Sequence, residues 1–224
     1  MDTDRQIETI AIIGGTGSLG TGLARRWARA GYKIVIGSRT APKAEAAASD
    51  LLKIIPAADV SGQANLDAAQ AADIVVLTVP FAHQQPTLED ISPGLTGKIL
   101  IDTTVPLVPP KVARVQLPEE DSAAVRAQAL VGEQVVVVSA FHNVAADLMD
   151  SDADMECDVL VAGDKLAARE IVIGLAEHAG FKAWHAGPLA NSAAMEALTS
   201  VLIFMNKRYP DSHAGIRITG ITES

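Results

Sequence analysis

The chain has 224 residues, of which 49% are hydrophobic and 20% are charged, which excludes a disordered protein and suffices for a full hydrophobic core. Its formal net charge is −9, so we expect neither nucleic acid nor an anionic membrane surface as a partner. Cys157 is the only cysteine, which excludes an internal disulfide and a cysteine-based metal site, and we expect no metal site of any kind.

Targeting signals are not evident in the sequence. The first residues are polar and acidic and contain no apolar run, so we expect no signal peptide. The longest apolar stretch, near 197–205, is too short to span a bilayer. We therefore expect a cytoplasmic protein.

A glycine-rich turn near the N-terminus carries the strongest functional signal. The β-branched run 10–13 predicts a strand, and the spacing of apolar residues over 19–30 predicts a helix. Between them, Gly15, Gly17 and Gly20 have the spacing of a pyrophosphate-binding turn, in which glycines permit the sharp turn, the backbone approach and the helix packing. The helix N-terminus would add unpaired N–H groups. We predict a dinucleotide site; the alternative is a glycine-rich turn of another α/β protein.

The residues after the second expected strand, 33–37, indicate which dinucleotide is bound. An NAD site usually has Asp or Glu here, but this chain has Ser38 and Arg39. Arg39 can bind a 2′-phosphate with two parallel hydrogen bonds, Ser38 can donate to it, and Lys43 can add a positive charge. We predict NADP; the alternative is that Arg39 is a solvated surface residue.

The rest of the chain alternates between expected strands and helices. This pattern predicts a doubly wound, mostly parallel Rossmann-like α/β sheet, whose strand ends form one rim that holds the active site. We expect a dinucleotide-binding domain over 1–150, a smaller C-terminal helical lobe over 151–224, and a gradual boundary between them. Further strands are expected near 58–60, 73–78, 98–102, 134–139, 157–162 and 181–184, and further helices near 42–55, 66–72, 83–91, 122–130, 166–179 and 193–206.

Six short segments, in this order, resemble the F420H2:NADP oxidoreductases, also called NADPH-dependent F420 reductases. The resemblance implies a dinucleotide-binding domain with a smaller C-terminal lobe, a homodimer, and NADP(H) and coenzyme F420 as the small-molecule partners. A dimer partner or the second lobe would then cover the apolar helix 193–206. The segments are 13–17, 37–39, 77–80, 139–142, 186–192 and 213–219.

The resemblance also implies the contacts of individual residues. Around the 2′-phosphate it implies Thr16, Ser38, Arg39 and Lys43. Along the pyrophosphate it implies Gly15, Gly17, Ser18 and Leu19, with Gly20 completing the turn. Beside the nicotinamide half it implies Val79 and Pro80. Bordering the deazaflavin ring it implies Val105, Pro106, His142, Asn143, Pro188 and Leu189, and we also count Ala140 among the cofactor-binding residues.

The activity implied is direct hydride transfer between NADP(H) and coenzyme F420, which needs no side-chain nucleophile. His142 is the ionisable residue at the carboxyl end of a strand in the rim, and we assign it as a hydrogen-bond donor to the deazaflavin. The alternative is that His142 orders its own loop. Two other functions stay open: an NADPH-dependent reductase of a flavin, metal chelate or imine, and a non-catalytic NADP-binding redox sensor.

Overall fold

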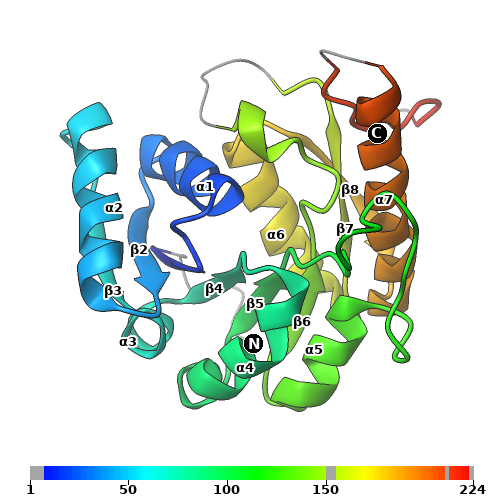
Figure 1. The fold of residues 1–224 in the computed structure, drawn as a ribbon. Helices are drawn as coiled ribbons and strands as arrows, with labels where there is room; N and C mark the ends of the chain where they lie inside the picture. Colours follow the sequence, from blue (N-terminus) through cyan, green and yellow to red (C-terminus); the bar gives the residue numbers. More distant parts are fainter. Residues whose placement is uncertain (1–7, 150–154, 210–211, 222–224) are drawn as a thin grey trace.

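Eight strands form one sheet in the order β3-β2-β1-β4-β5-β6-β7-β8, with helices on both faces (Figure 1). The computed structural model describes residues 8–149, 155–209 and 212–221. The strands are β1 Thr9–Ile13, β2 Lys33–Ser38, β3 Val60–Ala64, β4 Ile74–Leu77, β5 Ile99–Asp102, β6 Val136–Ser139, β7 Asp158–Ala162 and β8 Lys182–Gly187. The α-helices are α1 Ser18–Arg29, α2 Ala41–Ile54, α3 Asn65–Ala71, α4 Gln84–Ile91, α5 Ala123–Val131, α6 Leu166–His178 and α7 Ser192–Arg208.

The pairing of the strands fixes where a ligand can bind. The strands β1 to β6 pair in parallel, so their carboxyl ends lie along one edge of the sheet. From β1 the chain builds outward to β3, then returns to place β4 on the other side of β1. The loop after β1 and the loop after β4 lead away from each other at this reversal, which opens a crevice between the ends of the two strands. The predicted doubly wound fold is confirmed.

Two hydrophobic clusters hold the helices against the two faces. Successive strand residues point to opposite faces, so Ile10 and Ile12 pack with α1, α2 and α6, whereas Ala11 and Ile13 pack with α3, α4 and α5. Trp27 of α1 is fully buried, and its indole N–H donates to the carbonyl oxygen of Leu175, 2.8 Å away, in α6. This hydrogen bond ties the C-terminal half of the helix that follows the glycine turn to α6.

The third strand is not where the sequence pattern placed it. It spans Val60–Ala64 rather than 58–60, because the edge strand is polar and lacks the apolar alternation that marks a strand. Gly62 is required there: a Cβ atom would lie 2.2 Å from the carbonyl carbon of Ala44. The close approach seats the first turn of α2, which carries Lys43, against β3.

The C-terminal part extends the same sheet. β7 runs antiparallel to β6, with Ser139 opposite Ala162, and β8 is parallel to β7. β8 spans Lys182–Gly187, so the expected strand 181–184 is wrong in extent. α6 and α7 supply the helical part of this region, and the expected boundary at residue 150 lies outside the described residues.

Candidate functional site

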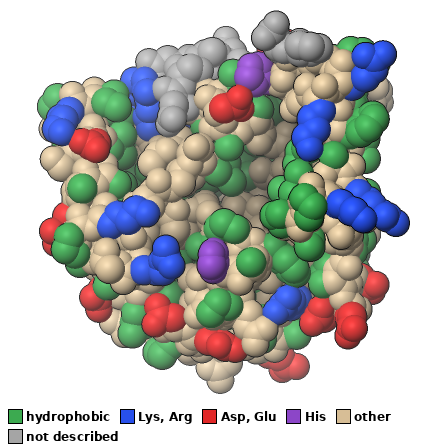
Figure 2. Space-filling view, viewed as in Figure 1, with side chains coloured by type: hydrophobic (Ala, Val, Ile, Leu, Met, Phe, Trp, Pro, Cys, Tyr) green, Lys and Arg blue, Asp and Glu red, His purple; other side chains and the backbone are tan. Residues whose placement is uncertain are grey.

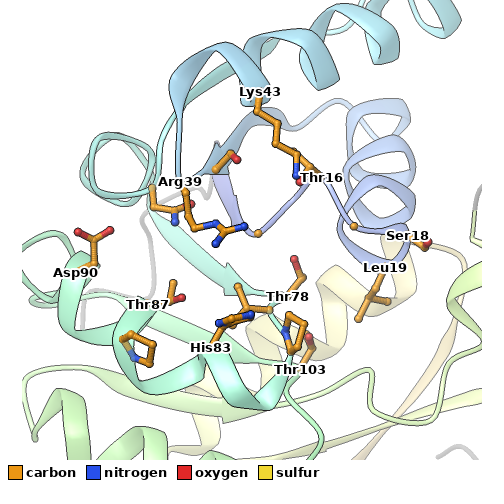
Figure 3. A pocket seen from close by; sticks show the side chains of 17 residues that line it. Thr16, Ser18, Leu19, Arg39, Lys43, Thr78, His83, Thr87, Asp90 and Thr103 are labelled. Carbon is orange, nitrogen blue, oxygen red and sulfur yellow. The ribbon is translucent and has the colours of Figure 1, made fainter. Parts of the chain in front are cut away.

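A cavity of about 840 Å³ lies at the carboxyl edge of the sheet, at the crevice between the ends of β1 and β4 (Figure 3). Figure 2 shows a hollow near the middle of this face, with Lys and Arg side chains on the side nearest α2. The volume is typical of a small-molecule site. The lining residues are Gly14, Thr16, Gly17, Ser18, Leu19, Ser38, Arg39, Lys43, Asn65, Thr78, Val79, Pro80, His83, Pro86, Thr87, Asp90 and Thr103.

Glycines bring the start of α1 close to the end of β1. Gly14 has φ +75°, a left-handed conformation, so the sharp turn begins one residue before Gly15, where the spacing placed it. A Cβ atom on Gly20 would lie 2.6 Å from the Cα atom of Gly15, so only glycine lets the helix pack on the turn. As a result, the first turn of α1 faces the cavity.

The N-terminus of α1 offers hydrogen-bond donors. Gly17 occupies the N-cap position and has no side chain to accept from the helix, and the first turn contains no acid. Within the part of the chain that the structure describes, the N–H groups of Ser18, Leu19 and Gly20 have no acceptor. Free N–H groups at a helix start carry partial positive charge and suit a phosphate.

Four further donors surround the end of β2. Ser38 is buried at the end of the strand, Arg39 follows it, Lys43 comes from α2, and Thr16 comes from the glycine turn. In the described ranges, no hydrogen bond or ion pair occupies these four side chains. Figure 3 shows Arg39 and Lys43 reaching toward the cavity from neighbouring elements. Two cations without a partner among the described residues make this part of the cavity a candidate anion site.

Threonines fix the opposite wall of the cavity. Thr78 Oγ1 donates to the carbonyl oxygen of Ile13, 2.9 Å away, and Thr103 Oγ1 donates to that of Leu77, also 2.9 Å away. These bonds join the ends of β1, β4 and β5. Val79 and Pro80, which follow β4, line the cavity beside them.

The structure separates the residues assigned to the two ligands. Nine of them line the cavity: Thr16, Gly17, Ser18, Leu19, Ser38, Arg39, Lys43, Val79 and Pro80. Gly15 and Gly20 lie in the turn behind it. The other cofactor-binding residues do not line the cavity. They are Ala140 and the six residues assigned to the deazaflavin: Val105, Pro106, His142, Asn143, Pro188 and Leu189.

Two of the residues assigned to the deazaflavin have structural contacts. The Asn143 side-chain amide donates to the carbonyl oxygen of Met195, 2.9 Å away, and to Thr199 Oγ1, 3.1 Å away. It therefore ties the loop after β6 to α7. Leu189 is 3% exposed and packs in the core beneath α5.

His142 is buried, and burial lowers the pKa of its imidazole to about 4. The ring is therefore neutral near pH 7 and carries one N–H donor. Neither ring nitrogen has a hydrogen-bond partner among the described residues. Its assignment as a donor to the deazaflavin stays a prediction.

Sequence reasoning missed one end of the cavity. Three of the residues that line this end come from α4 and the residue before it: His83, Thr87 and Asp90. Asn65 lines the cavity from the start of α3. The spacing of 83, 87 and 90 is that of one helical face, which could have revealed these three residues. Asn65 could not be found because the strand before it was misplaced. The other missed lining residues are Gly14, Thr78, Pro86 and Thr103.

Two buried carboxyl groups lie beneath the loop after β5. Asp102 accepts from Gln84 Nε2, 2.6 Å away, and from the N–H of Thr104, 2.9 Å away. Glu196 of α7 accepts from the N–H groups of Ala123 and Ala124, 2.7 and 3.1 Å away. These bonds favour ionisation, but burial outweighs them and raises the pKa of Asp102 to about 6 and that of Glu196 to about 8.

The described residues offer neither a metal cluster nor a membrane span. No group of three or more His, Cys, Asp or Glu side chains among them could hold a metal ion. Likewise, within the ranges described, every helix is too short or too polar to cross a bilayer.

Comparisons with known proteins agree on one family. Residues 9–106 match a family described as NADP oxidoreductase coenzyme F420-dependent. An F420-dependent NADP reductase of Methanothermobacter thermautotrophicus is 44% identical over 222 residues, covering 96% of this chain and 96% of the relative. An F420-dependent NADP reductase of Methanocaldococcus jannaschii is 40% identical, covering 95% of this chain and 98% of the relative.

Solved structures agree with the sequence relatives. A crystal structure described as a candidate F420-dependent NADP-reductase from Arthrobacter is 26% identical, with a TM-score of 0.75, and covers 91% of this chain and 95% of that one. An NADP-bound pyrroline carboxylate reductase from Plasmodium falciparum is 14% identical, with a TM-score of 0.54 over 80% of this chain and 57% of that one, and shares the fold.

Replacing Glu196 with Gln should change how stability depends on pH. The folded protein holds the Glu196 proton up to a pKa of about 8, whereas the ordinary value is 4.5, so the free energy of unfolding should fall as pH rises through this window. Above pH 6, where Asp102 has largely ionised, Glu196→Gln should remove most of this fall. Urea denaturation between pH 5 and pH 9 measures it, with the exposed Glu177→Gln as control. Equal pH slopes in wild type and Glu196→Gln would contradict the assignment.

Replacing Arg39 with Asp should weaken NADPH binding by about 1.5–3 kcal/mol or more, because a charged hydrogen bond is lost and a repulsion is added. NADH binding should change much less, since NADH lacks the 2′-phosphate. Fluorescence titration of both nucleotides measures the effect. Lys33→Asp makes the same charge change at the other end of β2 and should leave NADPH affinity unchanged. An unaltered NADPH affinity in Arg39→Asp would exclude Arg39 as a phosphate ligand.

Proposed function

The chain belongs to the family of F420-dependent NADP reductases, and we propose that it transfers a hydride between NADP(H) and coenzyme F420. The resemblance expected from the sequence is thereby confirmed. Two relatives at 40–44% identity that match almost their whole length carry this conclusion.

The lining of the cavity supports the mode of NADP binding that the sequence predicts. The uncapped N-terminus of α1 would hold the pyrophosphate with the N–H groups of Ser18, Leu19 and Gly20. Ser38, Arg39, Lys43 and Thr16 would hold the 2′-phosphate, because these donors have no partner among the described residues. The nicotinamide half would then lie toward Val79, Pro80 and Thr103, which line the cavity where β4 and β5 end.

The two coenzymes supply the chemistry, since NADP(H) gives or takes a hydride and the deazaflavin ring is the other party. The protein binds and orients two flat rings and keeps water away from them. Val79 and Pro80 are suited to this because they offer apolar surface and no competing proton donor. No residue of the chain needs to act as a nucleophile.

The deazaflavin site is proposed beside the nicotinamide end. β5 and β6 are the next strands beyond β4, so the loops that carry Val105, Pro106 and Ala140 follow neighbouring strand ends. Pro188 and Leu189 come from the turn after β8. His142, which is neutral, would donate its single N–H to the deazaflavin, with Asn143 fixing the loop that carries it.

We also propose that the protein is a cytoplasmic homodimer. α7 exposes apolar side chains in the described chain: Val201 is 44% exposed, Phe204 57% and Met205 40%. Figure 2 shows apolar side chains along this side of the molecule, over α7 and the loop before α5. An exposed apolar face of this kind is best covered by a second copy. The net charge of −9 supports the expectation that nucleic acid is not a partner.

Mixing the purified protein with NADPH and coenzyme F420 tests the activity. We expect the deazaflavin absorbance to fall while NADPH is consumed in equal amount. Bound NADPH without any loss of that absorbance would overturn the proposal. NADPH consumption with a flavin, metal chelate or imine instead would identify a reductase of another acceptor. Tight NADPH binding with no turnover on any acceptor would identify a redox sensor.

A further inference from the structure

The cavity continues past the 2′-phosphate donors to an acidic end. Asp90 and Thr87 of α4 line it there, and His83 lies nearer the middle. In Figure 3, Asp90 and Thr87 lie on one side of Arg39, whereas Ser18, Leu19 and Thr103 lie on the other. A dinucleotide held by its phosphates at α1 and Arg39 would therefore place one of its two ring systems at each end.

The carboxylate at this end is free to bind a ligand. Asp90 is exposed to the cavity, and it forms neither a hydrogen bond nor an ion pair with any described residue. A carboxylate repels phosphate groups, so Asp90 would not face the pyrophosphate or the 2′-phosphate. It can only accept hydrogen bonds when ionised. Its ligand at this position must therefore present an N–H or O–H group.

The ribose 3′-hydroxyl next to the 2′-phosphate also presents an O–H group, but beyond the 2′-phosphate such a donor comes from the adenine base. Its 6-amino group is a hydrogen-bond donor, whereas a 6-oxo purine presents an acceptor at the same position. Arg39 projects into the cavity opposite His83 and Thr87, and a guanidinium plane can stack on a purine. The base would lie flat between these groups with its amino edge toward Asp90.

We infer that Asp90 selects the base of the dinucleotide: its carboxylate accepts from the 6-amino group of adenine and rejects a 6-oxo purine. The inference rests on the proposed binding of NADP in this cavity. Asp90 is thus a specificity residue for the nucleotide and takes no part in the hydride transfer. In Figure 3 it lies at the end of the cavity away from Thr78 and Thr103.

The test compares the affinity of the protein for NADPH with its affinity for the NADPH analogue in which hypoxanthine replaces adenine. Both are titrated by nucleotide fluorescence in the absence of coenzyme F420, so the readout does not depend on turnover. Wild type should bind NADPH about five- to tenfold more tightly than the analogue, because the carboxylate would face a second acceptor. Asp90→Asn should bring the two affinities to within about twofold, because an amide can both accept and donate.

Glu89→Gln is the matched control. Glu89 is the neighbouring acid on α4, is exposed, accepts from Gln85 Nε2 and does not line the cavity, so this variant should keep the wild-type ratio. If Asp90 acts only through its charge on the phosphates, Asp90→Asn would change both affinities equally, which would overturn the inference. Equal affinities in wild type would also overturn it while leaving the F420 reductase activity standing. Conversely, a changed ratio without F420 reduction would remove only the proposed activity.

Discussion

The proposed binding of NADP depends on a candidate anion site whose positive charges are not neutralised by any described residue. The start of α1 has no side-chain cap, and the N–H groups of Ser18, Leu19 and Gly20 have no acceptor in the described chain. Arg39 and Lys43 add two cations without a partner in the same cavity. In the proposed complex, the phosphates of the dinucleotide would satisfy both sets of groups at once, so neither set needs a partner among the described residues.

The topology turns this site into a place for hydride transfer. β1 lies between β2 and β4, so the loop after β1 meets cations from the β2 side and apolar residues from the β4 side. In the proposed complex, the charged half of the dinucleotide would lie on the first side, and its nicotinamide on the second, next to the strand ends of β5 and β6. An F420-dependent NADP reductase needs two kinds of surface: charged groups that bind the phosphates away from the reacting rings, and an apolar surface beside those rings.

The glycine turn and the choice of NADP were predictable because the local sequence determines them. Glycine spacing after a β-branched run fixed the turn, and Arg39 in place of an acid indicated NADP; both depend on residues close together in the chain. β3 was misplaced because Ser61, Gly62 and Gln63 serve a packing need of α2 and show no apolar alternation. The helical spacing of His83, Thr87 and Asp90 could be found in the sequence, but not the fact that this face borders the cavity. That fact, and the burial that keeps His142 neutral, depend on contacts between distant segments, which a single sequence does not display. The contacts of the deazaflavin residues were taken from the resemblance, and they stay predictions.

The most direct test of the central claim is a calorimetric comparison of NADP⁺ and NAD⁺ binding to the wild-type protein at low and high salt. If unneutralised donors bind the 2′-phosphate, NADP⁺ should bind at least about tenfold more tightly at low salt, since each charged hydrogen bond contributes ~1.5–3 kcal/mol. The difference should shrink as salt screens the two exposed cations. Equal affinities for the two nucleotides at low salt would contradict the account.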